Sequence, residues 1–362
     1  MSSIQPLGRE VAAGAVFGAA LYSAGVYHPS VIQSQLRFDS FQMLQVMLGA
    51  SAASALVFHI ADRSGVMAKQ VRAPAALGWF PYDGNIIGGA LIGAGMALSG
   101  ACPGTVIVQA AVGIPTGPFV ALGGVLGAAA WLIIKPMMPA SRANGAKCNA
   151  TVASRASPAS SSSPEKIPTV ASALGTSEPR LLVFWEIMCV LAVGTLLKIW
   201  PGRSHALINP IAGGLFIGLA QAVTVYLANH TIGASKTYED IAQGILRILR
   251  QSNPKEQKES LGLQTLLTPS IAFAVGVFGI AFLLKDWKAF GVAASNAVVD
   301  DAAIISKPRA ILAGLSLVLG SRVAGGCTSG HCLSGLANFS LSSAITGAAM
   351  FAAGVAVASI SM

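Results

Sequence analysis

Two cysteines, Cys102 and Cys327, each stand where an apolar, small-residue helix is expected to stop abruptly. Each member of the first motif recurs 225 positions later, so that Gly89, Gly95, Gly100 and Cys102 return as Gly314, Gly320, Gly325 and Cys327. A helix break at membrane depth is costly unless it is buried in protein or lines a cavity. Matched breaks in corresponding halves are typical of substrate sites between the internal repeats of transporters. The two cysteines are therefore the first candidates for a translocation site.

The first break combines a thiol with the start of a helix. Cys102 is followed by Pro103 and Gly104, and proline is favoured at the first position of a helix. Cys102 is therefore predicted to cap a half-helix that begins at Pro103. The N–H groups and partial positive charge of a helix start attract anions and favour the thiolate. We expect an anion-attracting backbone beside a soft sulfur atom.

The second break offers a similar thiol with more polar neighbours. The glycine pair 325–326 permits a sharp turn before Cys327, and Thr328 and Ser329 place hydroxyls at the next helix start. His331 lies close in sequence. It either tunes the thiol or binds the substrate, or else it caps a backbone group.

Arg322 is the one charged residue deep in the span before Cys327. Charges within a membrane are expensive and mark function by default, although a long side chain can also reach the interface. We expect Arg322 to attract an anion or to extend towards the headgroups. Cys332 and Cys189 are interpreted as packing residues, and Cys148 as incidental.

Metal and nucleotide sites are not predicted. The stretch from Cys327 to Cys332 lacks the ligand spacing of a structural zinc site, and Cys102 has no neighbouring histidine. No glycine-rich phosphate loop followed by lysine is present. We therefore expect no cofactor, no bound metal and no ATP-driven step within the chain.

The composition indicates a membrane protein. The 362 residues are 54% hydrophobic and 10% charged, with a mean hydropathy of +0.67, whereas soluble domains carry roughly 25% charged residues. The net charge of +9 would suggest nucleic acid in a soluble protein. Here the basic residues lie in loops between apolar runs, which indicates membrane topology and contact with anionic lipid headgroups instead.

The apolar runs predict an all-α, polytopic membrane protein of two pseudo-symmetric halves. They cover residues 11–27, 41–61, 86–98, 105–113, 117–134, 181–200, 206–229, 232–249, 266–285, 304–324, 328–338 and 341–360. The runs 105–113 and 328–338 are too short to cross a bilayer, which needs about 20 residues. They are interpreted as broken or re-entrant helices, which either continue after a break or re-enter the membrane. We predict a first membrane repeat at 1–138, a Ser/Pro-rich linker at 139–179 and a second membrane repeat at 180–362. Basic residues around the linker predict that it is cytosolic.

Two stretches resemble the YeeE/YedE sulphur transport family of membrane proteins. They are GGCTSGHCLSGLANFS at residues 325–340 and LSGACPGTVIVQ at residues 98–109. The resemblance implies an hourglass-like helical fold whose pointed loops meet at mid-membrane. It also implies that Cys102 and Cys327 match the family's two central cysteines. A further family cysteine near the outer end of the first helix has no equivalent here, where the residues include Tyr22, Ser23 and His28.

The resemblance implies uptake of an inorganic sulfur anion such as thiosulfate, passed along thiols, by a transporter rather than an enzyme. Two alternatives stay open from the residues: a membrane sulfurtransferase that carries a cysteine persulfide, and an anion channel that does not use thiols. The plasma membrane is the default location, with an organelle membrane as the alternative. The partners expected are the anion and the bilayer, with a soluble sulfur-accepting protein compatible with either thiol mechanism.

Overall fold

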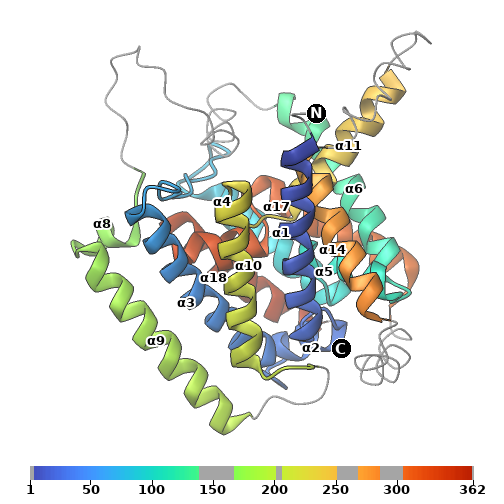
Figure 1. Cartoon of the computed structure of the whole chain (residues 1–362). Helices are drawn as coiled ribbons and strands as arrows, with labels where there is room; N and C mark the ends of the chain where they lie inside the picture. Colours follow the sequence, from blue (N-terminus) through green and yellow to red (C-terminus); the bar gives the residue numbers. More distant parts are fainter. Residues whose placement is uncertain (1–3, 138–166, 201–205, 251–267, 286–304, 361–362) are drawn as a thin grey trace.

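The computed structural model describes residues 4–137, 167–200, 206–250, 268–285 and 305–360 (Figure 1). Within these ranges the chain is helical, and its only β-type pairing is an isolated bridge between Thr169 and Ser340. The elements are α1 (Ile4–Ser23), α2 (Pro29–Leu36), α3 (Gln42–Arg63), α4 (Asp83–Ser99), α5 (Pro103–Val112), α6 (Gly117–Ile134), η1 (Lys135–Met137), α8 (Val170–Leu174), α9 (Glu178–Ile199), α10 (Pro210–Ala228), α11 (Ser235–Arg250), α14 (Pro269–Lys285), α17 (Lys307–Val323), η2 (Ser329–Gly335) and α18 (Leu341–Ile360). The predicted all-α class is confirmed.

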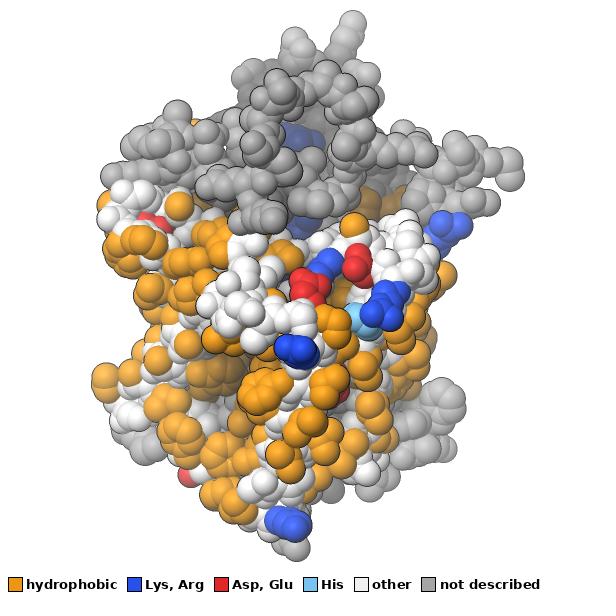
Figure 2. Space-filling model, turned by 90° about the vertical axis from the view of Figure 1, so that its left-hand side faces the viewer, with side chains coloured by type: hydrophobic (Ala, Val, Ile, Leu, Met, Phe, Trp, Pro, Cys, Tyr) orange, Lys and Arg blue, Asp and Glu red, His pale blue; other side chains and the backbone are white. Residues whose placement is uncertain are grey.

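The protein is an integral, multi-pass membrane protein. Six helical stretches of the described chain are long and apolar enough to cross a bilayer: Gln42–Arg63, Asp83–Val112, Gly117–Met137, Glu178–Ile199, Pro210–Ala228 and Leu341–Ile360. Figure 2 shows a broad band of hydrophobic side chains on one face of the molecule, with charged side chains gathered at its upper border. An apolar belt bounded by charges is the surface that a bilayer requires.

The two halves are related by inverted topology. Glu10, near the start of α1, contacts His230, just after the end of α10. At the other end, the Leu207 N–H before α10 donates to the Ser23 carbonyl at the end of α1. Helices α1 and α10, which carry matching Gly-x3-Gly pairs (Gly14 and Gly18, Gly214 and Gly218), therefore run in opposite directions.

The halves also exchange partners. Helix α1 packs on α14 and α3 packs on α10, while α4 packs on α18 and α6 packs on α17. Each of these pairs joins an element of the first half to one of the second. The interleaving places α4 and α17, which lead into the two breaks, against each other at the centre.

The repeated glycines allow α4 and α17 to approach closely. A Cβ atom on Gly88 would lie 2.4 Å from the Ala324 backbone nitrogen, and one on Gly95 would lie 2.8 Å from the Ala313 carbonyl oxygen. Small residues at helix interfaces permit such contact in membranes. The start of α4 lies beside the end of α17, so these two helices are also antiparallel.

Part of the predicted linker carries structure. Residues 138–166 lie outside the described residues, but the linker's last stretch forms the five-residue helix α8, whose Thr169 pairs with Ser340. Glu178, at the start of α9, forms an ion pair with Lys69 at 2.8 Å. The C-terminal end of the linker is thus fixed to both halves on one side of the molecule.

Candidate functional site

The first break is a left-handed turn followed by a helix cap. Helix α4 ends at Gly100, whose φ of 62° favours glycine, and Cys102 caps α5 as predicted. The Thr105 N–H donates to Cys102 Sγ at 3.4 Å, while Thr105 Oγ1 accepts from the Cys102 N–H at 2.8 Å. This reciprocal capping box holds the thiol rigidly at the helix start.

Residues that the motif does not contain also secure the first break. The Gln109 side-chain amide donates to the carbonyl oxygens of Gly100, at 3.0 Å, and Tyr27, at 2.8 Å. The Tyr238 hydroxyl of α11 donates to the Pro103 carbonyl at 2.8 Å. The second half of the chain thus braces the break of the first. No spacing rule predicts these long-range contacts.

The second break has a different backbone. Gly325, with a φ of 77°, follows α17, and the short helix predicted after Cys327 begins as a π-helical turn, η2. Cys327 Sγ lies 3.2 Å from Ser329 Oγ. Ser235 of α11 and the backbone N–H of Gly330 also lie near the thiol. Single π-helical turns are frequent at functional sites.

His331 and Cys332 lie behind the second break. His331 is buried, and its Nδ1 hydrogen-bonds to Ser343 Oγ of α18 at 3.0 Å. Cys332 is also buried, on the side of Gly347 of α18. Neither residue lines a cavity at the breaks. Both residues contact α18, while a Cβ atom on Gly326 would lie 2.9 Å from His331 Nε2, so His331 lies between α18 and the turn before Cys327.

A cavity of about 420 Å³ opens beside Cys327. Its wall includes Gly325, Gly326, Cys327 and Gly330 from the second break, together with residues from α1, α11, α14 and the segment before α4. The charged residues in its wall are Glu10, Arg72, Lys135, Lys236, Glu239 and Arg322, joined by His230. Lys135 follows α6 directly, so the cavity opens on the side of the molecule from which the linker departs.

Arg322 is held in an ion pair. Its guanidinium contacts the Glu239 carboxylate and the Ser235 hydroxyl, both from α11. The side chain is therefore paired with a carboxylate in the wall of the cavity. Ser235 touches both Arg322 and the Cys327 thiol, so it connects the pair to the break.

A second ion pair crosses the same cavity wall. His230 Nε2 lies 2.9 Å from a Glu10 carboxylate oxygen, and His230 Nδ1 lies 3.0 Å from the Thr231 carbonyl oxygen. Burial alone would lower the pKa of His230, but these hydrogen bonds, led by the one to Glu10, raise it above its ordinary value. The histidine is thereby biased towards its charged form.

Arg72 is a site residue that no pattern in the sequence indicates. It lies in the segment between α3 and α4, and its Nη1 donates to the Gly325 carbonyl at 2.9 Å. Its own carbonyl oxygen accepts from the hydroxyls of Ser340 and Ser342. A first-half arginine therefore reaches the break of the second half. Because Arg72 lies 253 positions before Gly325 along the chain, local sequence patterns do not indicate this contact.

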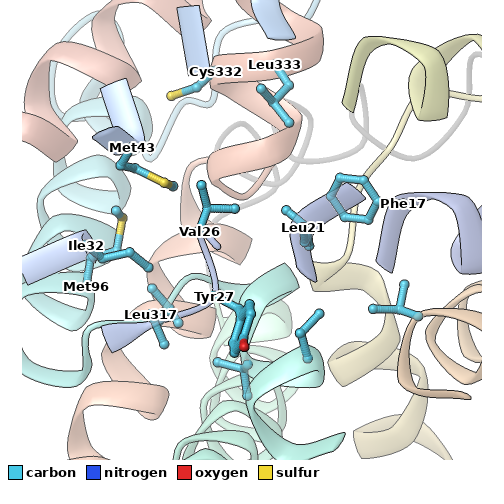
Figure 3. Close-up of a cluster of buried hydrophobic side chains, with 14 of the residues drawn as sticks. Phe17, Leu21, Val26, Tyr27, Ile32, Met43, Met96, Leu317, Cys332 and Leu333 are labelled. Carbon is cyan, nitrogen blue, oxygen red and sulfur yellow. The ribbon is translucent and has the colours of Figure 1, made fainter. Parts of the chain in front are cut away.

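A small apolar hollow lies beside Cys102. Its volume is about 30 Å³, room for little more than one water molecule. Hydrophobic side chains form most of its wall: Phe17, Leu21, Val26, Met43, Val46, Met47, Ile217 and Leu333. Figure 3 shows Leu21, Val26, Met43 and Leu333 grouped around one region. Gly104, Thr105, Thr328 and Ser329 complete the wall.

The predicted residues thus lie between two spaces, the charged cavity and the apolar hollow, and form a partition between them. Cys327 and Arg322 face the charged cavity, whereas Cys102, Gly104 and the Thr328–Ser329 pair face the apolar hollow. Ser329 contacts the Cys327 thiol and also borders the hollow of Cys102. Within the described residues, no group of three His, Cys, Asp or Glu side chains could hold a metal ion.

Comparison with protein families identifies the family of this chain. The sulphur transport family model matches residues 23–357, which include both breaks and both halves. The chain belongs to the YeeE/YedE sulphur transport family. Comparison with curated proteins gave no match. As a member of this family with several membrane-spanning helices, the protein has a sulfur-related membrane transport role.

Proposed function

We propose that the protein takes up a small inorganic sulfur anion such as thiosulfate and passes it between Cys327 and Cys102. The observation that carries this proposal is the pair of thiols on opposite sides of one partition. Cys327 borders the charged cavity, and Cys102 borders the apolar hollow. Ser329 contacts the Cys327 thiol and also borders the hollow. An anion that crosses the membrane through the centre of the fold meets both sulfur atoms.

Hydrogen-bond donors surround each thiol and suit it to an anion. Cys102 Sγ is approached by the N–H and the hydroxyl of Thr105, and Cys327 Sγ by the hydroxyls of Ser329 and Ser235. Donors of this kind at helix starts stabilise negative charge. The soft thiols face the terminal sulfur of the anion, while the donors and the cavity cations face its oxygens. No covalent bond forms or breaks in this mechanism.

The surroundings of the thiols favour transport over covalent sulfur transfer. A nucleophilic cysteine is normally activated by an adjacent base. Among the described residues, no histidine or carboxylate hydrogen-bonds to Cys102 Sγ or Cys327 Sγ. His331, the nearest histidine in sequence, is engaged with Ser343.

The test is uptake of radiolabelled thiosulfate by cells that lack their own uptake system. Cys102→Ser and Cys327→Ser are each expected to lower uptake to below about one tenth of wild type, since a hard oxygen replaces a soft sulfur at the partition. Cys189→Ser and Cys332→Ser are matched controls, because both cysteines are buried and neither lines the cavity or the hollow. Protein in the membrane is quantified for each variant.

Two outcomes would replace the proposal. Uptake that survives in the Cys102→Ser/Cys327→Ser double variant would indicate an anion channel that does not use thiols. A persulfide on either cysteine, detected by mass spectrometry after exposure to thiosulfate and turned over by an acceptor thiol, would indicate a membrane sulfurtransferase.

A further inference from the structure

Arg72 is fixed at both ends against the second break. The hydroxyls of Ser340 and Ser342 donate to its carbonyl oxygen at 3.0 Å and 2.9 Å, which anchors its backbone. At the other end, Nη1 donates to the Gly325 carbonyl at 2.9 Å. Contacts at both the backbone and the guanidinium therefore hold this side chain in position.

Glycines make the space that the guanidinium occupies. A Cβ atom on Gly326 would lie 2.6 Å from Arg72 Nη1, and one on Gly330 would lie 2.9 Å from Arg72 Nη2. These two glycines flank Cys327 in sequence. The guanidinium thus lies against the turn that carries the thiol, and any larger residue at either glycine would displace it.

Both carboxylates in the wall of the cavity are paired with residues other than Arg72. Glu239 pairs with Arg322, and Glu10 pairs with His230. Within the described residues Arg72 forms no ion pair, and its side chain makes one hydrogen bond although a guanidinium has five N–H donors. It is partly buried, and burial lowers the pKa of Arg72 below its ordinary value. A cation in such surroundings is stabilised when an anion binds beside it.

We propose that Arg72 binds the oxyanion end of the transported ion at the floor of the cavity and turns its terminal sulfur towards Cys327. The identity of this ligand, a small sulfur oxyanion, rests on the proposed function; the anion site itself does not. A guanidinium binds two oxygens of a tetrahedral anion in parallel, which fixes orientation as well as affinity. Arg72 then selects oxyanions, and Cys327 selects those that carry a terminal sulfur.

The experiment measures equilibrium binding of radiolabelled sulfate and thiosulfate to the full-length protein in lipid nanodiscs. Arg72→Gln is expected to weaken the binding of both anions about 10- to 100-fold, because hydrogen bonds from a charged donor are lost. Cys327→Ser is expected to weaken thiosulfate more than sulfate, which has no terminal sulfur. Arg63→Gln, a matched loss of one exposed positive charge at the end of α3, is expected to change neither by more than about twofold.

Two further variants keep the test decisive if Arg72→Gln folds poorly. Arg72→Lys retains the charge but not the two-oxygen geometry, so binding should fall by several-fold. Gly330→Ala brings a methyl group whose three nearest neighbours are all guanidinium atoms of Arg72, so it should weaken the binding of both anions while the fold persists. Sulfate binding that is equal in wild type, Arg72→Lys and Gly330→Ala would overturn the inference.

The result also separates this site from the transport proposal. Sulfate binding that depends on Arg72 supports the anion site even if the cells take up no thiosulfate. Conversely, thiosulfate uptake that needs both cysteines but is unchanged in Arg72→Gln supports the transport proposal and refutes the role of Arg72.

Discussion

The two breaks share a glycine spacing but differ in almost every neighbouring contact. At the first break, Cys102 caps a regular α-helix through a capping box and faces an apolar hollow of about 30 Å³. At the second, Cys327 precedes a π-helical turn and faces a charged cavity of about 420 Å³. The repeated glycines accompany a helix break in both copies, whereas the backbone after each break and the side chains around it differ.

The difference gives the site a direction. The charged cavity is open on the side of the linker, where an anion finds cations and solvent. The hollow beside Cys102 holds only about 30 Å³ between side chains such as Leu21, Val26 and Met43. An anion that passes Cys102 needs these side chains to move apart. Inverted repeats favour such a movement, because each half can adopt the other's arrangement.

The largest expected effect concerns the turn at the first break. Gly100→Ala would place a methyl group 2.7 Å from backbone atoms of Pro29 in a left-handed conformation. We expect it to lower the free energy of unfolding by about 3–5 kcal/mol, of which left-handed strain accounts for about 1–2 kcal/mol. Gly113→Ala is the matched control, since Gly113 is also left-handed but has open space around it.

Denaturant-induced unfolding in detergent micelles measures both variants. The control should lose only the strain component. Equal losses in the two variants would show that the contact between Gly100 and α2 does not constrain the first break.

The cap of each thiol gives the next largest difference. Thr105→Val leaves the buried Cys102 N–H without its acceptor, which we expect to cost about 2 kcal/mol. Ser329→Ala removes a single contact with Cys327 Sγ and should cost about 1 kcal/mol or less. The same unfolding measurement applies. The reverse order would mean that the π-helical turn, and not the capping box, is the more rigid holder of its thiol.

The ion pair at the second break should affect uptake more moderately. Arg322→Gln leaves Glu239 unpaired in the cavity wall, and a free carboxylate repels an anion, so uptake should fall about 10-fold. The double variant Arg322→Gln/Glu239→Gln should recover most of this loss if Arg322 acts only through Glu239. Failure to recover would show that Arg322 itself binds the anion.

The sequence predicted the features that depend on local chemistry. Most helices lie within the predicted apolar runs, although α1 is shifted towards the N-terminus and α2 was not predicted. The cap at Cys102 followed from Pro103, because proline at a helix start has a local physical cause. The structured end of the linker at α8 escaped prediction, since its Ser- and Ala-rich composition carries no apolar periodicity.

Contacts between distant segments were beyond the sequence. Arg72 lies 255 positions before Cys327, and nothing in its own segment points to a break. Likewise the ion pair of Arg322 with Glu239 arises because α11 packs against the end of α17. Such pairings follow from topology. The repeat in the sequence does not specify whether the two halves are parallel or inverted, and the antiparallel arrangement of α1 and α10 shows that they are inverted.

The smallest expected effect is a pH dependence confined to the charged side. The raised pKa of His230 means that its ion pair with Glu10 stabilises the fold fully below the unfolded pKa, about 6.5. This contribution is lost as the pH rises through the higher folded-state pKa. Lys236 opposes it, and the His230 side chain is 38% exposed, so solvent screening keeps the total below about 1 kcal/mol.

Thermal unfolding of wild type and His230→Gln between about pH 5.5 and 9 tests this dependence. The stability advantage of wild type should shrink as the pH rises, and 1 M salt should reduce it further because the pair is partly exposed. Glu10→Gln should give the same profile, whereas His59→Gln, whose histidine lies on α3 outside both spaces, should leave the wild-type dependence intact. The wall of the hollow beside Cys102 contains no ionisable residue other than that cysteine. A pH dependence that stayed unchanged in His230→Gln and Glu10→Gln would show that this ion pair is not its source.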